Sequence, residues 1–278
     1  MPHFLRLFYL FFLHFSCIAK VKYLAYYLYR RKTRNGGKKL KGTLYIVIPA
    51  YNEEENILNV INQWYPVINA HSAHGTSRLV IIDDGSKDST YHIMLEASKT
   101  RPLLLPITKE NSGHGGTVLY GYKYALENGA DYVFQTDSDG QTLPSDFEKF
   151  WWQRDNYDMV IGWRKGRQDG ASRVFVTKTL KLVIKCCFGV TLTDANTPFR
   201  LMRASTLRKY IDLIPNGFNL SNILLSVIYA KKGCSIHYIP ITFRPRQGGV
   251  NSINLPKIFK IGKQAVKDFR RLNKELKN

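Results

Sequence analysis

The feature that most constrains the fold is a repeated alternation of short apolar segments with longer amphipathic ones. The apolar runs are short enough to be strands: Thr43–Pro49, Arg78–Asp84, Leu103–Ile107, Tyr132–Phe134 and Met159–Gly162. Segments with the spacing and capping residues of helices lie between them. Strand–helix alternation of this kind predicts a parallel sheet with helices on its faces. We therefore expect an α/β fold with a doubly wound, mainly parallel sheet.

Polar residues gather where the apolar runs end. These ends carry Pro49-Ala50-Tyr51, Asp83-Asp84, the glycine-rich Asn111–Thr117 and Asp137-Ser138-Asp139. In open parallel sheets, ligands bind beyond the carboxyl ends of the strands. The first run lacks a following G-x-G-x-x-G, and GxxxxGK[ST] is absent from the sequence. The pattern therefore predicts a ligand site at this edge, of a kind other than a dinucleotide or P-loop site.

The segment Tyr132–Gln141, YVFQTDSDGQ, has the most specific chemistry. Asp137 and Asp139 are one residue apart, so in an extended segment their side chains point the same way. Two carboxylates that close repel each other unless a cation lies between them. With the amide of Gln141 they form an oxygen-only ligand set suited to Mg²⁺ or Mn²⁺, with positions left for substrate phosphates. A polar turn is the alternative, because DSDG is also good turn chemistry.

Basic residues are concentrated near the two ends of the chain. The formal charge is +20; residues 20–42 hold nine basic residues and no acid, and residues 257–278 hold eight basic residues and two acids. Such charge favours anionic partners. An anionic membrane surface is the partner we expect. Nucleic acid is not expected, because no aromatic-rich recognition motif accompanies the charge.

The N-terminal segment Phe4–Ala19 is almost wholly apolar, but it is shorter than the about 20 residues of a clean membrane span. A signal peptide, a helix at the membrane interface and a helix packed on the domain are all compatible with it. Near the other end, apolar residues at helical spacing predict a basic amphipathic helix. The expected organisation is a hydrophobic helix and basic linker (1–42), a first half of the α/β domain (43–162), a second half (163–254) and the amphipathic helix (255–278).

Several motifs together resemble a known family. The motifs VIPAYNEE at Val47–Glu54, IIDDGSKDST at Ile81–Thr90 and TDSDGQ at Thr136–Gln141 resemble the nucleotide-sugar half of family 2 glycosyltransferases, which have the GT-A fold. In the second half, the similarity is to dolichyl- or polyprenyl-phosphate sugar transferases. It is carried by GWR at Gly162–Arg164, SRVFVTK at Ser172–Lys178, DANTPFR at Asp194–Arg200 and FRPRQGGVNSIN at Phe243–Asn254.

The resemblance makes 43–162 the nucleotide-sugar-binding half and 163–254 the acceptor-binding half, and it implies roles for individual residues. It places Pro49, Ala50, Tyr51, Glu53, Asp83 and Asp137 around the nucleotide, with Asp83 bonded to the base. It makes Asp137, Asp139 and Gln141 the metal ligands, and Arg164, Arg173, Thr177 and Arg246 the acceptor-phosphate site. Asp137, Asp139, Asp194 and Arg200 are the catalytic set, with Arg200 near the diphosphate and supported by Asp194. His114 receives no role.

The implied activity is inverting transfer of a sugar from a nucleotide-diphosphate sugar to a polyprenyl or dolichyl phosphate, at the cytoplasmic face of a membrane. The enzyme would be peripheral or shallowly anchored there. An alternative acceptor is a glycan hydroxyl, as in surface polysaccharide assembly, for which Asp194 is the candidate base. A membrane-associated non-catalytic scaffold and a nucleic-acid-binding protein are the alternatives of other classes.

Overall fold

The computed structural model describes residues 42–72, 75–164, 171–244, 268–269 and 271–273, with the side chains of 171–178 excepted. Gly42–Asn278 forms one compact unit. The predicted hydrophobic helix and basic linker, Arg246, and most of the predicted amphipathic helix lie outside the described residues. Within the described part of the chain, no helix is both long enough and apolar enough to cross a membrane.

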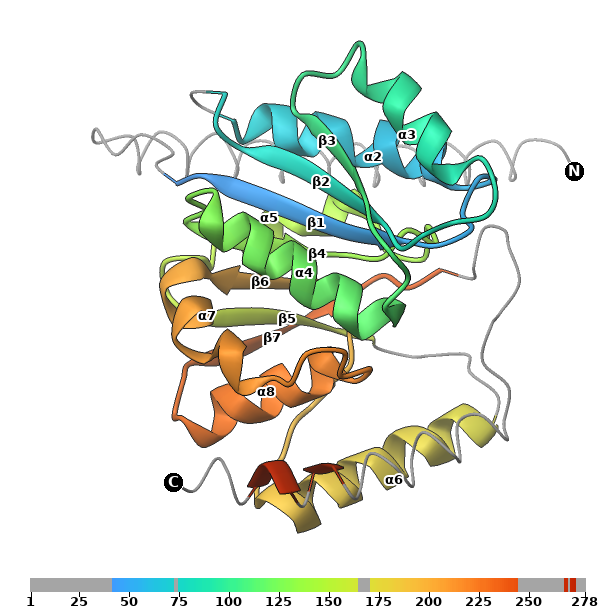
Figure 1. Ribbon diagram of the computed structural model, residues 1–278. Helices are drawn as coiled ribbons and strands as arrows, with labels where there is room; N and C mark the ends of the chain where they lie inside the picture. The colour runs from blue at the N-terminus through green and yellow to red at the C-terminus, as the bar shows by residue number, and fades with distance from the viewer. Residues whose placement is uncertain (1–41, 73–74, 165–170, 245–267, 270, 274–278) are drawn as a thin grey trace, which may run out of the picture. The chain divides into compact units, whose positions relative to one another are not determined.

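The described residues form a seven-stranded mixed sheet in the order β3-β2-β1-β4-β6-β5-β7 (Figure 1). The strands are β1 (Leu44–Ala50), β2 (Arg78–Asp83), β3 (Leu104–Thr108), β4 (Tyr132–Gln135), β5 (Met159–Arg164), β6 (Arg200–Arg203) and β7 (Ile236–Ile241). Strand β6 is antiparallel to β4 and β5, and the other neighbouring pairs are parallel. This confirms the expected mainly parallel α/β sheet. Both predicted halves contribute strands to it.

Helices cover both faces of the sheet (Figure 1). They are α2 (Ile57–Ala70), α3 (Thr90–Ser98), α4 (Gly113–Glu127), α5 (Phe147–Trp151), α6 (Ala171–Phe188), α7 (Ala204–Tyr210) and α8 (Ser221–Lys231), with 3-10 turns η1 (Pro144–Asp146) and η2 (Ile211–Leu213). Successive strand residues face opposite sides. In β1, Tyr45 and Val47 join the core beneath α4, α7 and α8, whereas Ile46 and Ile48 join the core of α2, α3 and α5.

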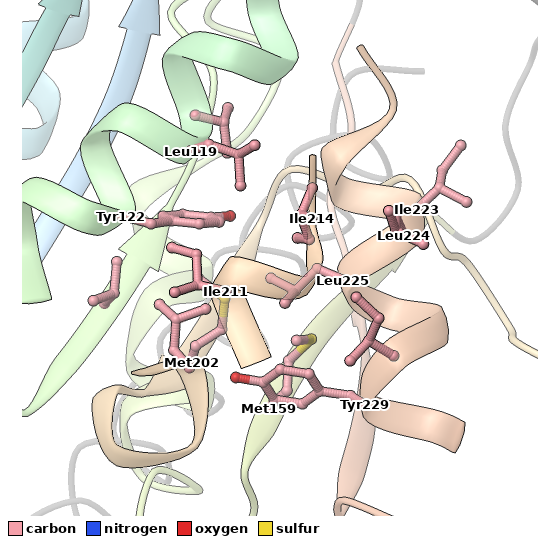
Figure 2. Close-up of a cluster of buried hydrophobic side chains, with 14 of the residues drawn as sticks. Leu119, Tyr122, Met159, Met202, Ile211, Ile214, Ile223, Leu224, Leu225 and Tyr229 are labelled. Carbon is pink, nitrogen blue, oxygen red and sulfur yellow. The ribbon is translucent and has the colours of Figure 1, made fainter. Parts of the chain in front are cut away.

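The two cores differ in composition. Figure 2 shows part of the first, where aliphatic and methionine side chains such as Leu225 and Met202 surround Tyr122 and Tyr229. The second core is rich in aromatic rings. Phe134 of β4 lies 4.7 Å from Phe199 and 5.4 Å from Trp64, measured between ring centroids. Buried aromatic rings contribute large apolar areas and favour such tilted contacts. These ring contacts fix the position of strand β4, which leads directly into the aspartate motif.

Helix α4 packs unusually close to the sheet at Gly121. A Cβ atom at this position would lie 2.4 Å from a side-chain carbon of Val47 in β1 and 2.5 Å from a side-chain carbon of Ile82 in β2. Both distances are too short for non-bonded carbon atoms. Only glycine lets the helix come this close without a shift of its neighbours. The contact holds the helix that begins at the glycine-rich segment against the two strands whose ends carry predicted nucleotide-site residues.

The first helix begins later than the sequence suggested. Ala50–Glu55 has the residue types of a helix start capped by Asn52, because asparagine is a good N-cap and acids suit the positive helix end, but α2 starts at Ile57 and its N-cap position is Asn56. Asn52 instead has a positive φ of 52°, which asparagine tolerates better than most residues. Residues 51–56 form a turn rather than a helix. The sequence therefore predicted the helix correctly but placed its start too early.

Candidate active site

The predicted site residues meet at one edge of the sheet. Strands β1, β2, β3, β4, β5 and β7 all end at this edge, and the antiparallel β6 begins there. Chain order reverses between β1 and β4, because β2 and β3 lie to one side of β1 and β4 lies to the other. Ligands of open α/β sheets bind at such a switch point. Pro49, Ala50 and Tyr51 lie at it, with the Tyr51 side chain 44% exposed.

The two aspartates at the end of β2, Asp83 within the strand and Asp84 directly after it, are buried and make different contacts. Asp83 accepts a hydrogen bond from the Thr108 hydroxyl at 2.7 Å and from the Ser86 amide at 3.2 Å. Asp84 accepts one from the Ser112 amide at 2.9 Å and forms an ion pair with Lys109. Burial by itself raises the pKa of Asp84, but the hydrogen bonds and the charge of Lys109 lower it overall. Asp84 therefore stays ionised and ties the end of β2 to the start of α4.

The loops after β1 and β2 bind each other reciprocally. The backbone N–H of Asn52 donates to the Ser86 hydroxyl, and the side-chain oxygen of Asn52 accepts from the backbone N–H of Lys87, both at 2.9 Å. Glu54 accepts from the Ser89 amide at 3.0 Å. Glu53 is buried, and its carboxylate accepts from the Asn56 side chain at 2.7 Å. Glu53 thus makes a local contact with the N-cap residue of α2. Hydrogen bonds between the loops after β1 and β2 therefore hold these two predicted nucleotide-binding loops in place.

The aspartate motif leaves β4 as a turn rather than as extended chain. Strand β4 ends at Gln135, residues 138–140 form a bend, and Gly140 has a φ of +69°. Asp139 accepts from the Gln141 amide at 3.1 Å, and the Gln141 side-chain nitrogen donates to the Arg244 carbonyl at 3.1 Å. The turn alternative was therefore correct for the backbone. Both carboxylates and the Gln141 amide oxygen remain suitable oxygen donors on this turn.

His114 reaches this turn from the first turn of α4. Its Nε2 lies 3.1 Å from Oδ1 of Asp137, and the two side chains are 51% and 28% exposed. Burial lowers the pKa of His114, but the charges of Asp137, Asp139 and Asp84 together raise it overall. Three carboxylates therefore act on a single imidazole at the sheet edge. The sequence analysis gave His114 no role. A histidine inside a glycine-rich turn at a strand end was the available signal.

The donor set fits a hard divalent cation, although it contains few acidic groups. Among the described residues, no three His, Cys, Asp or Glu side chains are grouped so that they could hold a metal. The predicted set has only two carboxylates, and its third member, Gln141, is an amide. Such sites are completed by water and substrate phosphates, as is common for Mg²⁺. The residues present therefore fit a metal held jointly with a diphosphate.

Arg164, the last residue of β5, links the second half to this edge. Its guanidinium forms a bidentate pair with Asp194, with Nε–Oδ2 and Nη2–Oδ1 distances of 3.0 and 3.1 Å. Its Cζ lies 5.2 Å from the ring centroid of Phe243, and Phe243 pairs with Thr142 just after the aspartate turn. The arginine predicted to bind the acceptor phosphate is therefore connected to the predicted metal turn through Phe243.

Arg200 does not have the surroundings expected of a diphosphate ligand. It is fully buried, and its guanidinium donates to the carbonyls of Ala195, Thr197 and Asn222 and to the Ser226 hydroxyl, at 2.6–3.3 Å. These five bonds use all five N–H groups of an arginine. The described ion pair of Asp194 is with Arg164. These bonds make Arg200 a buried structural anchor at the start of β6, and its place near the diphosphate stays a prediction.

Three predicted acceptor residues are beyond a structural description. Arg173 and Thr177 belong to α6, but the described side chains of that helix begin after them. Arg246 follows the last described residue of the β7 segment. Their role in binding the acceptor phosphate stays a prediction.

Known proteins share both the sequence pattern and the fold. Residues 45–211, most of the described sheet, match the family model of glycosyl transferase family 2. The chain belongs to this family. Its relatives include the UDP-N-acetylglucosamine–dolichyl-phosphate N-acetylglucosaminyltransferase of Methanococcus voltae, 31% identical over 185 residues (59% of this chain, 71% of the relative). The polyprenol monophosphomannose synthase of Mycolicibacterium smegmatis is 26% identical over 219 residues (75% and 80%).

A solved structure supports the fold assignment. Glucosyl-3-phosphoglycerate synthase from Mycobacterium tuberculosis, crystallised with Mn²⁺ and UDP-glucose, aligns with a TM-score of 0.61 at 15% identity, covering 86% of this chain and 84% of that one. At this identity the likeness concerns the fold alone. Family 2 membership makes the protein a glycosyltransferase with a GT-A-like sheet. The edge that carries Asp83, Asp137 and Arg164 is its candidate active site.

Proposed function

We propose that this family 2 enzyme transfers a sugar from a nucleotide-diphosphate sugar to a polyprenyl phosphate, with inversion at the anomeric carbon. The observation that carries the choice of acceptor is the Arg164–Asp194 pair. Both carboxylate oxygens of Asp194 are engaged by one guanidinium, which makes Asp194 a poor base for deprotonating a sugar hydroxyl. A phosphate acceptor is already ionised and requires no strong base. The two relatives, a dolichyl-phosphate sugar transferase and a polyprenol monophosphomannose synthase, support the same acceptor class.

In the proposed reaction, an acceptor phosphate oxygen attacks the anomeric carbon on the face opposite the diphosphate. The bond from that carbon to the diphosphate oxygen breaks, and the electron pair stays on the nucleoside diphosphate. Asp83, with its orientation fixed by Thr108 and Ser86, accepts a hydrogen bond from the base. Arg164 turns its remaining N–H groups toward the acceptor phosphate, a geometry that suits guanidinium recognition.

Asp137, Asp139 and Gln141 are the residues that would hold Mg²⁺ or Mn²⁺. Such an ion supplies positive charge next to the departing diphosphate. The turn after β4 presents these donors beside the predicted nucleotide loops. This arrangement suits electrostatic stabilisation of the leaving group, for which loss of one preorganised partner costs roughly 3–4 kcal/mol in the barrier.

We further propose that the enzyme works at the cytoplasmic face of a membrane. The basic residues of 20–42 would favour an anionic leaflet, to which each contributes about 1 kcal/mol near the surface. A polyprenyl acceptor would be supplied from that leaflet.

The test is a transfer assay on the full chain with UDP- and GDP-sugars, with and without polyprenyl phosphate and Mn²⁺. We expect product only with the lipid phosphate. Asp137→Ala and Asp139→Ala should each lower the rate by at least about 100-fold, in line with a lost electrostatic contact. Full activity in either variant would contradict the metal site. Transfer to a glycan hydroxyl without lipid phosphate would replace the acceptor proposed here.

Arg164→Ala separates the acceptor site from the donor site. It should abolish transfer to polyprenyl phosphate while the nucleoside diphosphate still binds with near-native affinity in a calorimetric titration. A loss of nucleotide binding would mean that Arg164 serves the donor instead. Arg154→Ala is the matched control, because Arg154 belongs to the turn after α5 and stacks on Trp151, and it should leave transfer unchanged.

A further inference from the structure

His114 touches the predicted metal turn, although it belongs to a different strand–helix connection. Its Nε2 lies 3.1 Å from Oδ1 of Asp137. A carboxylate that ligates a cation can rotate, and a hydrogen bond to one oxygen fixes which oxygen points to the ion. An ionised carboxylate only accepts hydrogen bonds, so the imidazole N–H is the donor. The contact therefore orients Asp137 before any ligand arrives.

The backbone that carries His114 is held from the side of β2. Gly113 has a φ of +77°, in the left-handed region that favours glycine. The preceding Ser112 donates its amide N–H to Asp84 and accepts from the Lys109 side chain at 2.7 Å. Thr117 closes the turn by donating to the Gly113 carbonyl at 3.0 Å.

The same turn is held from the side of α8. A Cβ atom at Gly115 would lie 2.2 Å from the Phe218 carbonyl oxygen, so the two backbones are in direct contact. The Ser221 hydroxyl donates to the Gly115 carbonyl at 3.1 Å. His114 thus stands on a segment fixed on both sides while its own side chain is 51% exposed. A rigid backbone segment that carries an accessible imidazole is suited to orienting a ligand-binding carboxylate.

Resting on the proposed metal-dependent function, we propose that His114 is a positioning residue that fixes the Asp137 carboxylate for the divalent cation and, through it, for the nucleoside diphosphate. Two other roles make different predictions. An incidental surface ion pair would contribute about 0–1 kcal/mol and leave cation binding unaffected. A direct metal ligand would place nitrogen on the ion.

The test measures Mn²⁺ binding to the full chain by the EPR signal of free Mn²⁺, with and without added UDP or GDP. His114→Ala should weaken Mn²⁺ binding about 10–100-fold, the usual effect of losing an outer-shell partner of a ligand, with an unchanged melting temperature. His114→Gln should restore most of the affinity, because its amide N–H can donate from a similar reach. His92→Ala, which changes an exposed histidine of α3, should behave as wild type.

Three results would overturn the proposal. The first is a native Mn²⁺ affinity in His114→Ala together with a weakened Mn²⁺ affinity in Asp137→Ala. The metal site would then exist, but His114 would not contribute to it. The second is a directly coordinated nitrogen in pulsed EPR of the wild type that disappears in His114→Ala, which makes His114 a ligand. The third is native Mn²⁺ affinity in both Asp137→Ala and Asp139→Ala, which removes the proposed metal site itself.

Discussion

At the scale of single residues, the buried Arg200 has a structural role that its sequence motif did not reveal. The resemblance places Arg200 near the diphosphate, and in the structure all five of its N–H groups face protein acceptors. Arg200→Leu removes the side-chain donors of the Thr197 carbonyl and weakens the satisfaction of the Ala195 and Asn222 carbonyls, which then share the Ser226 hydroxyl, at about 1–3 kcal/mol for each group left unsatisfied. We expect the free energy of unfolding to fall by about 3 kcal/mol or more in a urea titration.

The exposed Arg208 provides the matched control for this substitution. It donates one hydrogen bond, to the Leu126 carbonyl at 2.6 Å, so Arg208→Leu should cost at most about 1 kcal/mol. A stable Arg200→Leu protein that binds nucleotide poorly would restore the role on the diphosphate.

At the scale of secondary-structure elements, Asp158 joins three elements far from the candidate active site. It directly precedes β5 and accepts from the Thr206 hydroxyl of α7 at 2.7 Å. It also accepts from the amide and hydroxyl of Ser235, just before β7, at 2.9 and 2.8 Å. Burial raises the pKa of Asp158, but the hydrogen bonds from Thr206 and Ser235 lower it overall.

A lowered pKa in the folded state makes this contribution depend on pH. The stabilisation is complete above the unfolded-state pKa of about 3.9, and it is lost as the pH falls through the lower folded-state pKa. Asp158→Asn should therefore cost about 1–2 kcal/mol at pH 7, and its difference from wild type should shrink below about pH 4. Urea unfolding from pH 7 to pH 2 measures both. A constant difference over that range would contradict the ionised hydrogen-bonded role.

The exposed Asp212 is the control for Asp158. Its side chain is 81% exposed and pairs with Lys123 at the surface. Asp212→Asn should change the free energy of unfolding by under about 0.5 kcal/mol.

At the scale of the whole molecule, one sheet joins two cores, so the described unit should unfold as one. Leu225→Ala opens the first core and Phe134→Ala the second, each at a cost of about 2–5 kcal/mol. The four tryptophans at 64, 151, 152 and 163 all lie within Gly42–Asn278, so their fluorescence reports on this unit. Both variants should lower a single unfolding midpoint. Two separate fluorescence transitions in Leu225→Ala would mean that the cores unfold independently.

The sequence by itself determined the alternation of strands and helices, the edge at which the predicted site residues meet and the aspartate motif, because these depend on local periodicity and on residues adjacent in the chain. It did not determine the contacts between side chains from different connections. Asp194 pairs with Arg164 of β5, and His114 of α4 reaches Asp137, because β6 enters the sheet in reverse beside β4 and α4 is packed onto β1. Such partners are set by the packing of whole elements, so only the tertiary structure decided them.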